Sequence, residues 1–140
     1  MMIFQNTLNI NTNGRSTREI TAEVQELVTK SKIARGVCHL FIQHTSASLI
    51  ICENADPGVR VDLETFMQSI VPDGDPMFCH TTEGPDDMPA HIRTLITNVS
   101  LTVPVSSSRC QLGTWQGIYL WEHRIAAHRR NVIVTIYGEE

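Results

Sequence analysis

Strand-like segments outnumber helix-like segments in this chain, and the two kinds do not alternate in the β-α-β order of a parallel sheet. Residues 36–44 alternate between two faces as a strand does. Five further stretches also read as strands: 2–10, 49–54, 100–105, 112–122 and 132–137. Helices are predicted from Thr21, after Asp56-Pro57 and from Asp87, which can each supply a cap. The order of elements predicts an α+β fold with a curved, mixed but largely antiparallel sheet and two to three helices packed on it.

The size and charge of the chain limit its organisation and its partners. The 140 residues contain no internal repeat, low-complexity segment or linker, so one domain spanning 1–140 is expected. Eleven Lys and Arg stand against 15 Asp and Glu, a net charge of −4, which lacks the basic excess typical of nucleic-acid-binding proteins. No apolar run approaches the ~20 residues that span a bilayer. Neither nucleic acid nor a membrane is therefore expected as a partner.

The four cysteines fall singly, without a C-x-x-C pair, so a cysteine-rich zinc site is not expected. The first six residues, Met1–Asn6, have neither the basic nor the apolar region of a signal peptide. We therefore expect reduced thiols and a cytoplasmic protein.

Apolar spacing predicts which helical side chains are buried. Helix by helix, the predicted inward-facing residues are Val24, Leu27 and Val28; Val59, Leu63, Phe66 and Met67; and Ile92, Leu95 and Ile96. The last strand, 132–137, is apolar on both faces, which is typical of a strand covered on both sides or lying at a subunit interface. The basic cluster Arg124, Arg129 and Arg130 before it is interpreted as a solvated turn.

Six histidines, against only two lysines, are the main chemical signal. His44 ends the strand 36–44 on its apolar face. Asp87 and His91 are four residues apart on a predicted helix and share a face, with His80 in the loop before it. A carboxylate there can orient the imidazoles or join them as a metal ligand. Glu122 alternates with apolar residues and would be a buried carboxylate, so it requires a His, Arg or metal partner.

Each signal also has a structural interpretation. A histidine at a strand end is often only a hydrogen-bonded structural residue, and an Asp-x-x-x-His pair is often a surface contact. Motifs of the common hydrolases, NTPases and dinucleotide-binding proteins are absent. Three hypotheses remain open: an enzyme with a metal-assisted pocket, a non-catalytic metal- or small-molecule-binding (regulatory) module, and an assembly scaffold with structural histidines.

Three stretches resemble the YjbQ family, often described as secondary thiamine-phosphate synthases. They are QHTSASLIICENADPGVRVDLE (43–64), HTTEGPDDMPAHI (80–92) and LGTWQGIYLWEHR (112–124). The match is most similar to the enterobacterial branch, which also reads E-H-R after the T-W-Q strand. Most of the family has an E-x-D-G-P-R ending there, so the glycine-proline turn is missing from this chain.

The resemblance implies a half-barrel fold, a homotrimer and a polar pocket near a subunit boundary. The implied pocket residues are His44, His80, His91, Gln116 and Glu122. A divalent metal, Zn²⁺ or Mg²⁺, would be held by His44, His80 and His91. Ligand-binding roles are expected for Thr45, Ser46, Asp87 and Arg124. The implied activity joins a pyrimidine diphosphate to a thiazole phosphate, so a phosphorylated small molecule is the expected ligand, and Arg124, Arg129 and Arg130 are candidates for binding its phosphates.

Overall fold

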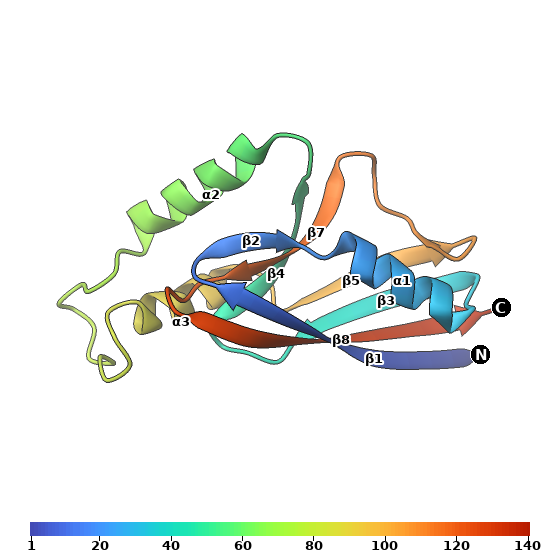
Figure 1. The fold of residues 1–140 in the computed structure, drawn as a ribbon, viewed down its shortest axis with the longest axis horizontal. Coiled ribbons are helices and arrows are strands. Elements are labelled where there is room, and N and C mark those ends of the chain that lie inside the picture. The colour runs from blue at the N-terminus through green and yellow to red at the C-terminus, as the bar shows by residue number, and fades with distance from the viewer.

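The chain folds into two antiparallel sheets that curl around one main core, with three helices, in the computed structural model, which describes residues 1–140 (Figure 1). The strands are β1 (Met2–Asn13), β2 (Ser16–Glu19), β3 (Arg35–Ile42), β4 (Ala47–Glu53), β5 (Ser100–Ser106), β6 (Arg109–Cys110), β7 (Gln116–Glu122) and β8 (Ala127–Glu139). The helices are α1 (Thr21–Ser31), α2 (Pro57–Ile70) and α3 (Asp87–Ile96). The predicted α+β half-barrel is confirmed.

The larger sheet has the strand order β1-β8-β3-β5-β6, and all of its pairings are antiparallel. Its long central strand β8 pairs along its length with β1, from Met2 opposite Gly138 to Asn13 opposite Ala127. The side chains of Val132, Val134 and Ile136 alternate into the main core. Helix α1 and the strands of the smaller sheet pack against this face of the larger sheet.

The smaller sheet has the order β2-β7-β4 and separates two apolar clusters. Ile118 and Leu120 of β7 face the main core. Tyr119 and Trp121 face the opposite way, into a smaller cluster with residues of α2 and α3 such as Met67. Alternate residues of β7 therefore belong to two different compartments, which matters for the polar residues at its end.

Helix α1 packs in the main core through Val24, Leu27 and Val28, as predicted. The predicted cap at Thr21 is wrong, because the residue at the cap position is Ile20, which makes no side-chain cap bond. The hydroxyl of Thr21 instead accepts a hydrogen bond from the backbone N–H of Ile118 at 2.9 Å. Thr21 therefore ties α1 to strand β7 rather than capping its own helix.

Helices α2 and α3 bury less than their apolar spacing predicts. Asp56 caps α2 as expected, accepting the N–H of Gly58 at 2.8 Å. The predicted cap of α3 at Asp87 is wrong, because the cap position is Asp86, whose side chain makes no cap hydrogen bond. The predicted burial of Phe66, Leu95 and Ile96 is wrong: their exposed fractions are 61%, 81% and 54%. The two helices cover only part of the small sheet with a narrow stripe, as the separation of α2 from the strands shows (Figure 1). No helix in the structure is long and apolar enough to cross a membrane.

Strand β8 begins five residues earlier than the sequence pattern predicts, at Ala127. Arg129 and Arg130 thus lie in a strand, and the interpretation of this cluster as a solvated turn is wrong for Arg130, which is only 3% exposed. Arg130 has the same parity as Val132 and Val134, so its side chain enters the core side of the sheet.

Candidate functional site

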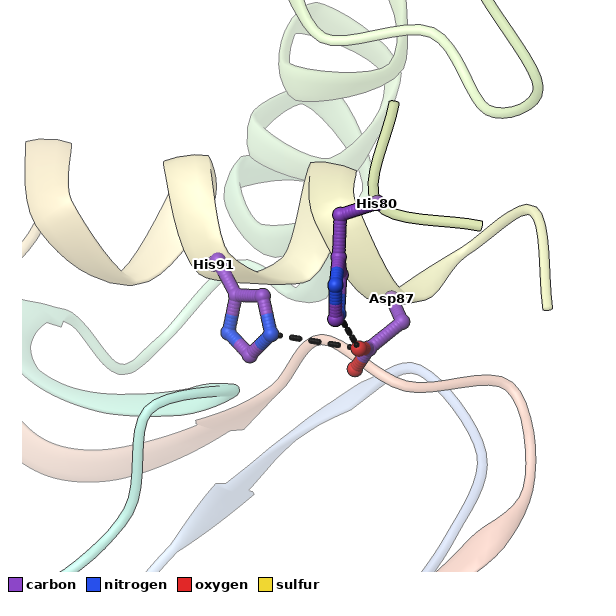
Figure 2. Close-up of side chains that lie close together, drawn as sticks. All are labelled: His80, Asp87 and His91. Atoms are coloured by element: carbon purple, nitrogen blue, oxygen red, sulfur yellow. Dashed lines mark hydrogen bonds and ion pairs between the residues drawn. The ribbon is translucent and has the colours of Figure 1, made fainter. Parts of the chain in front are cut away.

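His80, Asp87 and His91 form a cluster at the start of α3 (Figure 2). Asp87 and His91 come from successive turns of α3, and His80 enters from the loop before it. Nε2 of His80 and Nε2 of His91 lie 2.7 and 3.1 Å from the same oxygen of Asp87, Oδ2. One ligand atom from each of the three residues lies within 4.8 Å of the others. The three side chains could therefore share one divalent cation.

The main chain of the β3–β4 connection orients His91. Nδ1 of His91 lies 2.8 Å from the carbonyl oxygen of Thr45, which can only accept, so Nδ1 carries a proton. In the neutral ring this leaves a lone pair on Nε2, facing Asp87. A histidine that donates from one nitrogen to a backbone carbonyl and presents the other nitrogen's lone pair has the usual arrangement of a metal ligand.

Asp87 is buried and held as a carboxylate. Burial alone would raise its pKa, but the hydrogen bond from His80 and the positive charge of Arg124 outweigh burial and lower the pKa. Its second oxygen, Oδ1, lies 2.9 Å from Nη1 of Arg124. By contrast, the side chains of His80 and His91 are 43% and 29% exposed. The cluster is anchored at the carboxylate and open to solvent at the imidazoles.

Arg124 is committed to acidic groups on the same side of α3. Its Nε donates to Asp86 at 2.9 Å, and its Nη2 donates to the carbonyl of Glu83 at 2.9 Å. Together with the contact to Asp87, these bonds use all of the guanidinium's nitrogens. Arg124 thus braces the loop before α3 against the end of β7.

A second polar network joins the two sheets at the end of β7. Glu122 is fully buried and bound twice by Arg130, from Nε at 2.7 Å and from Nη2 at 2.5 Å. The hydroxyl of Thr12 and the N–H of Arg124 complete its partners at 2.5 and 3.1 Å. Burial alone would raise the pKa of Glu122, but these bonds outweigh burial and lower it. Of the His, Arg or metal partner expected for this carboxylate, the structure supplies an arginine, Arg130.

His44 lies beside this network, just after β3. Its Nε2 accepts the backbone N–H of Asn131 at 2.8 Å, and its Nδ1 lies 3.3 Å from Nη1 of Arg130. Burial, and then the charge of Arg130, lower the pKa of His44. His44 is thus held neutral and turned toward Arg130 rather than toward the cluster on α3.

The β3–β4 connection separates two surface cavities. One, of about 390 Å³, is lined by His44, Thr45 and His91 together with α3 residues. The other, of about 460 Å³, is lined by His44, Thr45, Ser46 and Arg130. A ligand on this connection would contact residues of both polar groups.

Comparison with known proteins assigns the chain to a family. The family model described as UPF0047 protein YjbQ-like matches residues 6–139. The chain belongs to this family. A UPF0047 protein of Synechocystis sp. is 48% identical over 135 residues, covering 96% of this chain and 92% of that protein. The UPF0047 protein YjbQ of Escherichia coli O157:H7 is 44% identical over 139 residues, covering 99% of this chain and 100% of that protein.

Solved structures of the YjbQ-like type share the fold. A conserved hypothetical protein of Thermus thermophilus is 30% identical with a TM-score of 0.84, covering 94% of this chain and 99% of that one. An uncharacterized conserved protein of the YjbQ/UPF0047 family from Clostridium acetobutylicum is 30% identical with a TM-score of 0.83, covering 96% of this chain and 99% of that one. UPF0047 is a family of uncharacterised proteins, so it identifies the fold and leaves the reaction to the chemistry of the site.

The YjbQ-like chain brings together most of the residues singled out from its sequence, but in two groups. His80, Asp87 and His91 form one group, next to Arg124. His44, Ser46 and Glu122 belong to the other, with Arg130. Thr45 lies between them through its carbonyl. His44, predicted as a third histidine ligand, lies outside the metal-type cluster, whose third member is Asp87.

Gln116 stands apart from both groups. It begins β7 and Glu122 ends that strand, so the two lie about 20 Å apart at roughly 3.3 Å per residue. Its side-chain oxygen accepts the N–H of Gly113 at 2.8 Å and holds the turn before the strand. Within one subunit Gln116 does not reach the histidines.

Sequence reasoning singled out Arg130 only as part of a turn and as a phosphate candidate, and it missed both the burial of Arg130 against Glu122 and the contact with Thr12. The signal for Arg130 was present, because it alternates in register with Val132 and Val134 and a buried Glu122 requires a cation. Thr12 carries no such signal, since only the pairing of β1 with β8 brings it to Glu122.

Proposed function

We propose that this chain is a metal-binding protein whose His80, Asp87 and His91 hold one divalent cation. The observation that carries the proposal is the contact between Nε2 of His91 and Oδ2 of Asp87. With the proton of His91 committed to Thr45, two acceptor atoms face each other at 3.1 Å. A cation between them, or a second proton on His91, removes this repulsion. Titration with metal separates these two states.

The donor set favours Zn²⁺ or a similar transition metal over Mg²⁺. Two imidazole nitrogens and one carboxylate oxygen are the ligand types of catalytic zinc sites, which keep a further position open. Mg²⁺ prefers oxygen ligands, of which this cluster offers few. The exposed sides of His80 and His91 would leave room for a ligand. A bound cation there would offset the charge of a phosphorylated small molecule.

The candidate reaction is the one implied by the family resemblance: joining a pyrimidine diphosphate to a thiazole phosphate as a weak or secondary thiamine-phosphate synthase. In this proposal the roles within the chain divide as follows. His80, Asp87 and His91 hold the cation, while Arg124 keeps Asp87 ionised and fixed. His44 and Thr45 contact the ligand from the β3–β4 connection.

A second candidate, a non-catalytic regulatory module that binds a metal or a small molecule, is favoured by one observation. Expulsion of diphosphate requires cations beside the leaving group. Arg124, the arginine next to the cluster, already donates to Asp86, Asp87 and Glu83. A binding module needs no such free cation, so the engagement of Arg124 favours the module.

We further propose that the protein assembles as a homotrimer and works in the cytoplasm. Its four cysteines are unpaired, which supports a reducing compartment. Several large apolar side chains of α2, α3 and the β6–β7 loop are exposed, among them Phe66, Leu95 and Trp115, and they suit contacts between subunits. In such an assembly Gln116 of one subunit could approach the cluster of another. Light scattering after size-exclusion chromatography tests the trimer: a mass of one or two chains rejects it.

Metal binding is tested first, by titrating chelator-treated protein with Zn²⁺ and Mg²⁺ and by native mass spectrometry. We expect one Zn²⁺ per chain and weaker binding of Mg²⁺. His91→Ala should weaken Zn²⁺ binding by about 100-fold, and His39→Ala, a histidine outside the cluster that pairs with Thr102, should leave it unchanged. Equal loss in both variants, or no Zn²⁺ bound to the wild type, rejects the metal site.

Activity is tested separately, by measuring thiamine phosphate and diphosphate released from the two phosphorylated precursors with the Zn²⁺-loaded protein. Turnover that is lost in Asp87→Asn and kept in His39→Ala supports the enzyme. Stoichiometric binding of metal or precursor without turnover supports the regulatory module instead.

A further inference from the structure

The imidazole of His44 faces hydrogen-bond donors on both sides. The backbone N–H of Asn131 points at Nε2 from 2.8 Å, and Nη1 of Arg130 points at Nδ1 from 3.3 Å. A neutral imidazole has one N–H and one acceptor, so it can accept only one of these two bonds. At one of the two ring nitrogens, an N–H of His44 must therefore face the N–H of a neighbouring donor.

The backbone contact decides which nitrogen carries the proton. Asn131 belongs to strand β8, where it pairs with Asn9 of β1 and its carbonyl accepts the N–H of Gln43 at 3.1 Å, so its own N–H cannot turn away. It makes the shorter of the two contacts, so Nε2 accepts it and the proton of the neutral ring lies on Nδ1. His44 is neutral because burial and the nearby charge of Arg130 lower its pKa. Nδ1–H of His44 and Nη1–H of Arg130 are then two adjacent donors without an acceptor.

The remaining nitrogens of Arg130 are already satisfied. Nε and Nη2 donate to Glu122, and Nη2 also donates to the carbonyl and hydroxyl of Ser46. Only Nη1 has no oxygen acceptor. The guanidinium is held in place by the carboxylate on one side, so Nη1 is presented in a fixed direction.

We propose that Nδ1–H of His44 and Nη1–H of Arg130 form a binding site for an oxyanion, a phosphate or a carboxylate, at the cavity beside the β3–β4 connection. Both residues line that cavity, whose volume of about 460 Å³ is ample for a phosphorylated or carboxylated small molecule. The two donors lie 3.3 Å apart, a spacing that suits one oxygen or two oxygens of the same anion. An acceptor there removes the mismatch at His44.

The proposed oxyanion site and the proposed metal site flank the same backbone segment. Thr45 follows His44 directly, and its carbonyl holds His91. An anionic ligand seated on His44 and Arg130 can therefore extend along the connection toward the cluster on α3. The oxyanion site itself depends only on His44, Arg130 and Asn131, so it stands or falls independently of the metal.

The first test uses the wild-type protein and needs no substitution. Nitrogen-15 NMR of the histidine rings, with chelator present, should show His44 as the Nδ1–H tautomer at pH 7. Titration with inorganic phosphate, and in a second arm with acetate, should shift the Nδ1 signal of His44. A Nε2–H tautomer, or no shift with either anion, overturns the proposal. The arm that gives the tighter binding identifies the class of oxyanion.

Variants then test the two donors. His44→Gln places an amide oxygen near the position of Nε2, where it can still accept from Asn131, but removes the Nδ1 donor. Arg130→Lys keeps a cation beside Glu122 but removes the planar fork. Each should weaken binding of the preferred anion by about tenfold or more, the effect of one hydrogen bond to a charged group.

Arg129→Lys is the matched control, because Arg129 is the exposed neighbour on the same strand and the same substitution there also keeps the net charge. Its affinity for the anion should equal that of the wild type. If Arg129→Lys weakens binding as much as Arg130→Lys, the loss does not depend on the guanidinium beside His44 and the proposed site is rejected. Circular dichroism establishes that each variant is folded, and the tautomer measurement stands on its own if a variant is not.

Discussion

Removal of Arg130 should destabilise the protein far more than removal of any exposed arginine. Arg130 is 3% exposed and Glu122 is fully buried, and their bidentate pair has nitrogen–oxygen distances of 2.7 and 2.5 Å. In Arg130→Met the apolar stem is replaced, but the carboxylate of Glu122 keeps only the Thr12 hydroxyl and the N–H of Arg124. Leaving one partner of a buried pair uncompensated costs about 3–5 kcal/mol.

The assay is urea unfolding followed by circular dichroism at pH 7, with thermal unfolding as a second measurement. At about 3 °C per kcal/mol for a chain of this size, the melting temperature should fall by roughly 10 °C. Arg129→Met, one residue away on the exposed face of β8, should change stability by less than about 0.5 kcal/mol. The double variant Glu122→Gln/Arg130→Met should recover a large part of the loss, because it removes the buried charge.

The stability cost of Arg130→Met should also depend on pH, in a direction set by the pKa of Glu122. In the wild type the pKa of Glu122 is lowered, so the pair contributes stability above the unfolded carboxyl's pKa and loses it as pH falls through the folded value. Without Arg130, burial raises the pKa of Glu122, and the penalty appears only where the carboxyl is ionised. The cost of Arg130→Met should therefore shrink as pH falls from 7 toward 4. A cost below about 1 kcal/mol at pH 7, or one independent of pH, refutes this reasoning.

Two further predictions concern His123, which is buried, and Gly36, which lies in β3. Burial first, and then the charge of Arg93, lower the pKa of His123 to about 3. The free energy of unfolding should therefore be constant with respect to this histidine above about pH 6.5, the pKa of an unfolded histidine, and should fall by about 1.4 kcal/mol per pH unit below it. His123→Gln should flatten urea-derived stability between pH 6.5 and 4; an unchanged slope contradicts the assignment. Gly36→Ala should cost about 1–3 kcal/mol or more in thermal unfolding, because its Cβ would lie 2.0 Å from the carbonyl oxygen of Tyr137. Gly113→Ala, which meets only a flexible side chain at 3.3 Å, is its control and should stay near the wild type.

Local signals in the sequence predicted the fold class because strand alternation and the Asp56-Pro57 helix start are short-range features. The alternation in residues 36–44 follows directly from the two faces of β3, one of which lies in the main core. The burial of Phe66 and Leu95 was predicted wrongly for a different reason. Helical spacing identifies an apolar stripe, but what covers that stripe depends on how far the helix stands from the sheet or from another subunit.

The site was predictable where its residues are neighbours in sequence. Asp87 and His91 share a helix face by spacing alone, so their meeting follows from the helix itself. His80 required the path of the loop before α3. Arg130 required the extension of β8 back to Ala127, which apolar patterning does not show because the added residues are polar. The residue types of the site could therefore be predicted from the sequence, whereas the contacts between residues on different strands could not.

The β3–β4 connection explains why the two polar groups are held at a fixed distance from each other. The carbonyl of Thr45 accepts from His91, whereas the carbonyl of Ser46 accepts from both Arg130 and the backbone N–H of His123. These contacts use main-chain atoms, so they depend on the length and path of the connection rather than on its side chains. Both carbonyls belong to the short segment between Ile42, where β3 ends, and Ala47, where β4 begins. The path of this connection therefore sets the spacing between the cluster on α3 and Arg130, through the Thr45 carbonyl on one side and the Ser46 carbonyl on the other.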